Sequence, residues 1–170
     1  LGTDTAQLSP AMRDTFRAEH FGIIFQMFNL LPYGTVLDNV VLPLNFSKSR
    51  AARVAHSRGQ AQEAERLLSA LGLEGARMAG ARTSHLSVGQ QQRVAAARAL
   101  IGKPEIIVAD EPTSALDRNL QVAFLDLLFA EIASAGSSLV MVSHDESLGA
   151  RFDRVLRLAD IAVTSRGPAP

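Results

Sequence analysis

Residues 106–112 have the sequence IIVADEP, a branched apolar run that ends abruptly in two adjacent carboxylates, Asp110 and Glu111. Such a run is typical of a buried strand in a parallel sheet. Ligands of doubly wound sheets bind at the carboxyl ends of the strands, so we expect both acids to lie where a substrate binds. Successive strand residues point to opposite sides, which gives the two acids different tasks. One can orient Mg²⁺ and the other can polarise an attacking water, although the pair alone is equally compatible with a surface turn.

Apolar runs and helical segments alternate along the rest of the chain, and this order predicts an α/β domain with a largely parallel sheet. Strands are expected at the short apolar runs, which are residues 21–26, 105–109, 138–142 and 155–158. Helices are expected at residues 9–19, 46–80, 90–100 and 120–133.

Local signals mark some of the helix ends. Ser9 is suited to cap the first helix and Pro10 to occupy its first position. Gly72 and Gly75 are expected to end the second helical region. The tail, residues 165–170, is expected to fray.

The composition of the 170 residues excludes several function classes. The chain has 17 basic and 17 acidic residues, so it lacks the basic excess that is usual for a nucleic-acid binder. It has no cysteine, which excludes a disulfide scaffold, a cysteine metal site and a cysteine nucleophile. Its apolar runs are far shorter than the ~20 residues of a membrane span, and no signal peptide is recognisable at its start.

A second motif, LSVGQQQR at residues 86–93, places a serine and a glycine at the start of a predicted helix. Free N–H groups and the helix dipole make such a terminus an anion site, to which Ser87 adds a hydroxyl donor. Gly89 lets a phosphate approach the backbone. The alternative is an ordinary helix that Ser87 caps.

Two further polar residues follow predicted core strands. Gln26 closes the first strand, and its amide oxygen can bind metal or accept from water, although a plain loop amide is the alternative. His144 follows the strand at residues 138–142. A lone histidine is more often structural, but this position at a strand end favours a functional role.

The order and spacing of these motifs resemble those of ABC transporter nucleotide-binding domains over nearly all of residues 20–158. Five motifs in one order make the resemblance specific, although each motif alone is weak. The matches are Gln26 (Q-loop), LSVGQ with Ser87, Val88, Gly89 and Gln90 (signature motif), IIVADE (Walker B strand), SALD with Ser114, Ala115, Leu116 and Asp117 (D-loop), and His144 (switch histidine).

The resemblance implies a P-loop NTPase-like, RecA-like core with a mostly parallel sheet and an inserted helical subdomain. It divides the chain into a core remnant with the Q-loop (1–40), a helical subdomain with the signature motif (41–100), and a core part with the Walker B, D-loop and switch motifs (101–170). The N-terminal strand and the phosphate loop of this family's core are absent from the sequence.

The resemblance also implies ATP hydrolysis by two such domains that face each other head to tail. The signature residues would close over ATP bound by the partner domain. Glu111, His144 and Gln26 would be catalytic, Asp110 and Gln26 would hold Mg²⁺, and the D-loop with Asp117 would couple the two sites. The implied partners are a second copy of the domain and membrane-spanning permease subunits. The permease subunits would contact residues 28–32 at the cytoplasmic face of the membrane.

The sequence departs from the family pattern in two places. Val88 replaces the first of two glycines that usually follow the signature serine, which is expected to affect rate more than function. No G-x-x-x-x-G-K-[ST] loop occurs in the 170 residues, and the chain starts with Leu1. We therefore expect the phosphate loop to precede Leu1 in the natural chain, and the isolated piece to have negligible ATPase activity.

Within the family, the segment FGIIFQMFNLLPYGTVLDNV at residues 21–40 resembles ATPases of the lipoprotein-release and macrolide-export type. Amino-acid importer ATPases share several of these residues. A soluble ABC-type ATPase that acts on DNA or ribosomes is a rival, but the interval from Gln26 to Leu86 is too short for the coiled coil of the DNA-repair members. A non-catalytic partner that lends its signature face to an intact ATPase is a second rival, against which the presence of Glu111 and His144 argues.

Overall fold

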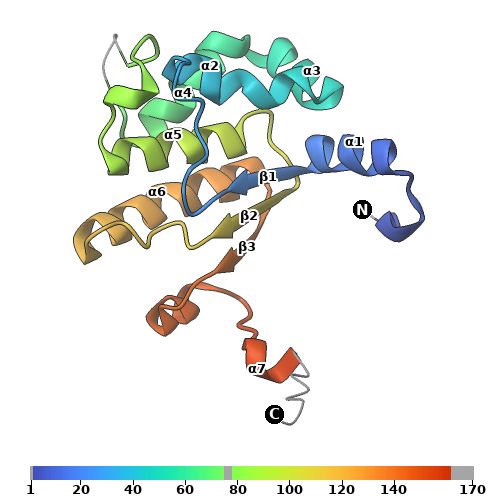
Figure 1. The fold of residues 1–170 in the computed structure, drawn as a ribbon, viewed down its shortest axis with the longest axis vertical. Helices are drawn as coiled ribbons and strands as arrows, with labels where there is room; N and C mark the ends of the chain where they lie inside the picture. Colours follow the sequence, from blue (N-terminus) through green and yellow to red (C-terminus); the bar gives the residue numbers. More distant parts are fainter. Residues whose placement is uncertain (1, 75–77, 162–170) are drawn as a thin grey trace, which may run out of the picture.

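The computed structural model describes residues 2–74 and 78–161 (Figure 1). The predictions for Gly75 and for residues 165–170 lie outside this part of the chain. The strands are β1 (Phe21–Ile24), β2 (Ile106–Asp110) and β3 (Ser138–Val142). The α-helices are α1 (Pro10–His20), α2 (Val36–Val41), α3 (Lys48–Ser57), α4 (Gln60–Ala70), α5 (Val88–Leu100), α6 (Arg118–Ala135) and α7 (Leu158–Ile161). Short 3-10 helices are η1 (Thr5–Gln7), η2 (Leu42–Asn45), η3 (Thr83–His85) and η4 (Glu146–Arg151).

The three strands form one parallel sheet in the order β1-β2-β3, which confirms the predicted α/β class. Helices α2 to α5 connect β1 to β2, and α6 connects β2 to β3 (Figure 1). Both connections are crossovers, as parallel pairing requires. Ile24 pairs with Ala109, and Ala109 pairs with Met141, so the three strands end close to one another along the same edge.

The core lies between the sheet and helices α5 and α6. Ile24 and Ile107 of the sheet and Phe124 of α6 are fully buried, together with most of the alanines of α5. These small side chains let α5 approach β1 so closely that a Cβ at Gly22 would overlap the carbonyl oxygen of Ala99. Only glycine therefore fits at this position of the strand.

The predicted helix signals are confirmed where the structure describes them. Ser9 caps α1 by accepting a hydrogen bond from the Met12 N–H, and Pro10 is the first helical residue. After α4, Gly72 takes a left-handed conformation with φ of 74°. Leu73 N–H then donates to the carbonyl of Leu68, which ends the helix in the manner typical of a glycine stop.

The predicted strand at residues 155–158 is wrong. Residues 154–157 have no regular structure, and the chain enters the short helix α7 at Leu158. Val155 and Leu156 are 61% and 57% exposed. Branched and apolar residues favour a strand only where a neighbouring strand pairs with their N–H and C=O groups, and the described sheet provides no such pairing for this segment.

One face of the sheet is not covered by the described residues. Ile23, Val140 and Val142 alternate onto this face and are 38%, 55% and 55% exposed. Parallel sheets are usually covered on both faces. The apolar character of these strand positions is therefore not explained by packing within the described part of the chain.

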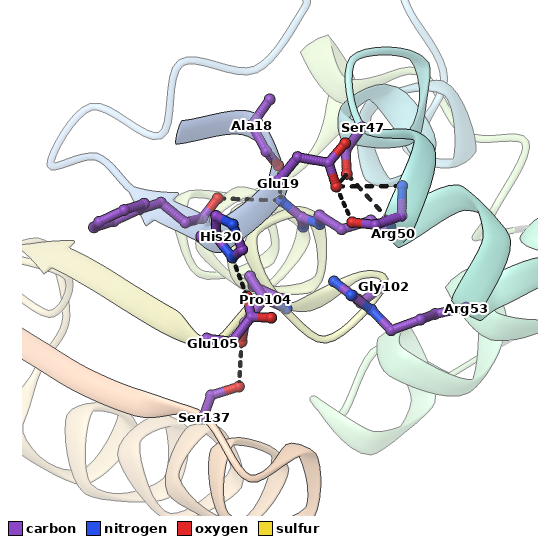
Figure 2. Close-up of polar contacts among 12 residues, drawn as sticks. Ala18, Glu19, His20, Ser47, Arg50, Arg53, Gly102, Pro104, Glu105 and Ser137 are labelled. Atoms are coloured by element: carbon purple, nitrogen blue, oxygen red, sulfur yellow. Dashed lines mark hydrogen bonds and ion pairs between the residues drawn. The ribbon is translucent and has the colours of Figure 1, made fainter. Parts of the chain in front are cut away.

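A polar junction fixes α3 to the sheet (Figure 2). The Arg50 side chain is 2% exposed and lies among backbone carbonyls. Its guanidinium donates to the carbonyl oxygens of Ile101 (2.9 Å), Ala99 (3.1 Å) and Phe21 (3.1 Å). Burial lowers the pKa of Arg50 to about 10, with a smaller effect of the Arg53 charge in the same direction, so the buried group is still a cation near neutral pH.

Glu19, the penultimate residue of α1, holds the other side of this junction. Its carboxylate accepts hydrogen bonds from Ser47 Oγ (2.9 Å), Lys48 N (3.1 Å) and Ser49 N (3.2 Å), and also from Ser49 Oγ. The free N–H groups of the first turn of α3 are therefore partly satisfied by α1. Figure 2 shows Glu19 and Arg50 side by side at this meeting point of α1, α3 and the end of α5.

A second polar contact joins α1 to Glu105, the residue immediately before β2. His20 Nδ1 lies 3.0 Å from Glu105 Oε2. Burial raises the pKa of Glu105, but its own backbone N–H and His20 outweigh this effect, so the pKa lies below its ordinary value. A depressed carboxyl pKa stabilises the fold above the unfolded-state pKa, and this contribution is lost as the pH falls through the folded-state pKa.

We expect the substitution Arg50→Met to lower the free energy of unfolding by about 3 kcal/mol, because it leaves several buried carbonyls without their donor. Arg58→Met, at the exposed end of the same helix, should change it by less than about 0.5 kcal/mol. Urea-induced unfolding of the intact protein measures both changes. Equal effects of the two substitutions would show that the junction contributes nothing beyond a surface arginine.

Candidate functional site

The residues singled out at strand ends lie beyond one edge of the sheet. Asp110 pairs with Val142 at the end of β2 and β3, and Ile24 ends β1 one position earlier. Gln26 follows β1, Glu111 follows β2 and His144 follows β3. The parallel topology therefore places these polar residues after strand ends that share one edge of the sheet, and a role for them in binding or catalysis stays a prediction.

The structure brings Glu111 and His144 into direct contact. His144 Nδ1 lies 2.9 Å from Glu111 Oε1, and the two side chains are 78% and 17% exposed. The sequence predicts both residues as functional but contains no signal for this contact. The carboxylate is thus largely shielded, and the accessible imidazole beside it can orient it.

The backbone at Glu111 explains how the contact arises. Glu111 has a φ of 43°, in the left-handed region that bulky residues avoid. Its N–H donates to the carbonyl of Val142 at 3.0 Å, and its carbonyl accepts from Ser114 N and Oγ. The chain thus leaves β2 in a strained turn that directs Glu111 toward β3, and strained residues of this kind cluster at functional sites.

Three glutamine and aspartate side chains that the sequence analysis missed support this turn. Gln92 on α5 donates to the carbonyl of Pro112, and its Oε1 is buried without a hydrogen-bond partner in the described part of the chain. Gln121 on α6 donates to Thr113 Oγ1 at 2.9 Å and to Asp145 Oδ2 at 3.4 Å. Gln92 alone gave an available signal, because it is 1% exposed at a position of α5 that is normally apolar, whereas Gln121 and Asp145 are only partly buried.

Asp145 also shapes the loop that carries His144. Its carboxylate accepts from Ser147 Oγ (2.6 Å) and Ser147 N (3.0 Å), and these bonds lower its pKa below the ordinary value. The acid therefore stays ionised and begins the turn η4 immediately after His144.

The residues of the predicted D-loop connect β2 to α6. Asp117 caps α6 by accepting from Leu120 N at 3.0 Å, while Ser114 and Ala115 are exposed. Leu116 approaches the start of α5, where a Cβ at Gly89 would lie 3.7 Å from Leu116 Cδ2. The D-loop and the signature motif are therefore neighbours within this chain.

The start of α5 has the geometry of a reciprocal cap. Ser87 Oγ accepts from Gln90 N at 3.3 Å, and Gln90 Oε1 accepts from Ser87 N at 2.9 Å. The ordinary capping interpretation of Ser87 is thus correct as local structure. Val88 is 49% exposed, so its side chain projects from the motif without being buried by this chain. A contact between these residues and phosphate stays a prediction.

The polar residues at the strand ends fit a metal ion that takes most of its ligands from a bound phosphate group. They do not form a site in which the protein supplies all the ligands. No cluster of three or more histidine, aspartate or glutamate side chains able to hold a metal occurs among residues 2–74 and 78–161. Asp110 is exposed at the end of β2, and Gln26 is exposed beyond β1. Mg²⁺ binds through one or two carboxylates with phosphate oxygens and waters supplying the rest, so this sparse donor set suits it.

Within residues 2–74 and 78–161, none of the helices combines the length and the hydropathy of a transmembrane span.

Comparison with known proteins defines the class. A sequence model described as "ABC transporter" matches residues 2–114, which is well over half of the chain. The chain belongs to the ABC transporter family, as its motifs and its α/β fold with a parallel sheet lead one to expect.

The relatives agree with the predicted type within the family. The chain is 42% identical over 157 residues to the lipoprotein-releasing system ATP-binding protein LolD of Novosphingobium aromaticivorans, covering 92% of this chain and 66% of that protein. It is 39% identical over 163 residues to the macrolide export ATP-binding/permease protein MacB of Rhodopirellula baltica, covering 94% of this chain and 22% of that protein. An uncharacterized ABC transporter ATP-binding protein of Escherichia coli K12, YbbA, is 42% identical over 164 residues.

Solved structures show the same fold. The ATP-binding cassette MJ0796, in a dimeric post-hydrolysis state bound to ADP and Pi, matches with a TM-score of 0.68 and 37% identity. The match covers 84% of this chain and 60% of that structure. The chain thus spans about a fifth to two thirds of the length of the proteins that it matches.

We expect Ser87→Ala to lower the free energy of unfolding by about 1 kcal/mol, because it removes the cap of α5, whereas Ser87→Asp should preserve stability. Thermal unfolding of the intact protein without nucleotide measures this difference. If both variants are as stable as the wild type, the cap contributes nothing to the fold.

Proposed function

We propose that the protein containing this chain is the ATP-hydrolysing subunit of an ABC transporter of the export or lipoprotein-release type. The observation that carries the proposal is the direct contact between Glu111 and His144 at adjacent strand ends. In a member of this family, that contact unites an acid able to act as general base with a histidine that orients it. Decay of the site by mutation would not preserve both residues in contact.

In this proposal, Glu111 accepts a proton from the attacking water, and His144 holds the carboxylate and contacts the terminal phosphate. Gln26, beyond the neighbouring strand, orients the water. ATP would supply the phosphoryl group that is transferred to water, and Mg²⁺, when bound, would neutralise the charge of the phosphates. Asp110, with help from Gln26, is the residue that would hold Mg²⁺, because its carboxylate is exposed at the end of β2.

We propose that the signature residues act on a second copy of the domain. Ser87, Val88, Gly89 and Gln90 form the start of a 13-residue helix whose N-terminal dipole favours phosphate. Gly89 has space above its backbone, since a Cβ there would meet only Leu116 at ordinary contact distance. The relative MJ0796 is dimeric, which supports the same arrangement here. The nearby D-loop, through Asp117, would couple the two sites.

The proposed membrane partner fits an apolar groove beside the edge strand β1. The groove has a volume of about 400 Å³ and is lined mostly by apolar side chains. Phe46 is 68% exposed there and Phe25 is 40% exposed. A partly apolar segment of a permease subunit is suited to this groove, which would hold the protein at the cytoplasmic face of the membrane. The main apolar lining residues are Phe21, Ile23, Phe25, Leu42, Pro43 and Phe46.

We expect Glu111→Gln in the intact protein to lower ATP turnover at least ~100-fold while ATP binding is retained, because only the general base is removed. Steady-state phosphate release and nucleotide binding at equilibrium measure the two effects. Glu146→Gln, an exposed acid in the loop after His144, is the control and should turn over normally.

Two results would contradict the proposal. Normal turnover by Glu111→Gln would remove Glu111 from the reaction. An intact wild-type protein that lacks turnover but stimulates a separate ABC ATPase through Ser87 would favour the alternative of a non-catalytic, signature-donating partner.

We expect Phe46→Cys, labelled with a thiol-directed photo-crosslinker in membranes, to form adducts with a membrane-spanning segment of the transporter. The 170 residues contain no cysteine, so the introduced thiol is unique within them. Met12→Cys, at an apolar position of α1 that is 58% exposed and lies outside the groove, is the matched control. Mass spectrometry of the adducts identifies the crosslinked segment. Equal crosslinking yields from the two positions would contradict the proposed docking of the permease in the groove.

A further inference from the structure

The segment immediately after Gln26 has an unfavourable backbone conformation. Phe28 and Asn29 have φ angles of 60° and 48°, both in the left-handed region. Asparagine tolerates this region, but it is a costly conformation for a phenylalanine. Two consecutive residues persist there only where the surrounding structure holds them, so something must hold this turn.

The side chain that holds the turn is Arg98. It is 8% exposed, and its guanidinium donates from one nitrogen to the carbonyl of Asn29 at 2.7 Å and from the other to the carbonyl of Phe28. The planar fork of an arginine matches two adjacent acceptors in a way that a lysine cannot. Within the described part of the chain these hydrogen bonds end on backbone carbonyls rather than on a carboxylate, so the cation serves the backbone of the turn.

Arg98 lies in the last turn of α5, the helix that begins with the cap formed by Ser87 and Gln90. One continuous helix of 13 residues therefore carries the signature motif at its start and the anchor of the turn at its end. Gln26 precedes the first anchored residue, Phe28, by two positions. A rotation of α5 that moves Ser87 would pull on the carbonyls of Phe28 and Asn29 through Arg98.

We propose that Arg98 is a positioning residue that fixes the place of Gln26 and couples it mechanically to the signature motif. The inference rests on the proposed function, because it assigns Gln26 a task in ATP turnover. Arg98 and Asn29 also line the apolar groove, so an occupant of that groove contacts the same anchor. Arg98 itself touches neither substrate nor reacting atoms in this proposal.

The chain offers a matched control on the same helix. Arg93 also donates from its guanidinium to a backbone carbonyl, that of Leu71, at 2.6 Å. Leu71 follows α4 and is remote in sequence from Gln26. Arg93→Gln removes an arginine–carbonyl bond from α5 without releasing the turn.

The first measurement is amide hydrogen exchange of the intact protein without nucleotide. The Phe28 N–H donates to the Phe25 carbonyl at 3.0 Å, and the Asn29 N–H donates to the Met27 carbonyl at 2.6 Å, so both amides are hydrogen-bonded while the turn is intact. We expect Arg98→Gln to accelerate their exchange about tenfold or more, and Arg93→Gln to leave it unchanged. Exchange of the amides in the middle of α5 should be the same in both variants.

The second measurement is rescue by glycine. Glycine adopts positive φ without penalty, so Asn29→Gly should restore part of the protection and of the turnover that Arg98→Gln loses. In steady-state kinetics, Arg98→Gln should lower kcat about tenfold and change KM for ATP less than about threefold. Arg98→Lys should fall between Arg98→Gln and wild type, and it replaces Arg98→Gln if that variant does not fold.

The outcomes separate this inference from the proposed function. Unchanged exchange at Phe28 and Asn29 in the Arg98 variants would overturn the inference, as would equal effects of Arg93→Gln. Faster exchange without a selective loss of kcat, or without rescue by Asn29→Gly, would reduce Arg98 to a purely structural role and overturn it as well. A wild-type protein without ATP turnover would instead contradict the proposed function. The hydrogen-exchange experiment would still show whether Arg98 holds the turn.

Discussion

The buried guanidinium of Arg50 is the constraint on which the rest of this structure depends. It donates to carbonyls at the end of α5 and at the start of β1, and so joins the segment between the first two strands to the sheet itself. A cation can be buried here because five N–H donors meet an array of carbonyl dipoles, which replaces the lost hydration. Glu19 adds the complementary contact by capping α3 from α1.

The close approach of α5 to β1 follows from this junction and determines where the functional groups lie. The small residues of α5 and the missing side chain of Gly22 allow helix and strand to touch. With α5 packed against β1 in this way, its first turn presents Ser87 near the D-loop, and its last turn presents Arg98 to the turn after Gln26. The site is thus assembled by one helix whose two ends contact two different loops.

Three of the four non-glycine residues with positive φ in the described part of the chain lie in loops that leave the sheet. Glu111 directly after β2, and Phe28 and Asn29 after β1, adopt left-handed conformations although none is a glycine. Each is held by partners from another element: the β3 carbonyl of Val142 for Glu111, and Arg98 for the other two. Strain that is maintained in this way lets a loop change shape when its partner moves, which suits a domain that must respond to a ligand.

The sequence by itself determined the parallel α/β class, the three strands to within one or two residues, the cap at Ser9 and the family, because apolar periodicity, capping residues and ordered motifs are local properties of the chain. It left the cap at Ser87 as one of two alternatives. It wrongly predicted a strand at residues 155–158, since branched residues favour a strand only where a partner edge exists. Only the tertiary structure decided the Glu111–His144 contact and the carbonyl partners of the two buried arginines. Every residue carries a backbone carbonyl, so the residue types do not indicate which carbonyls a distant side chain contacts.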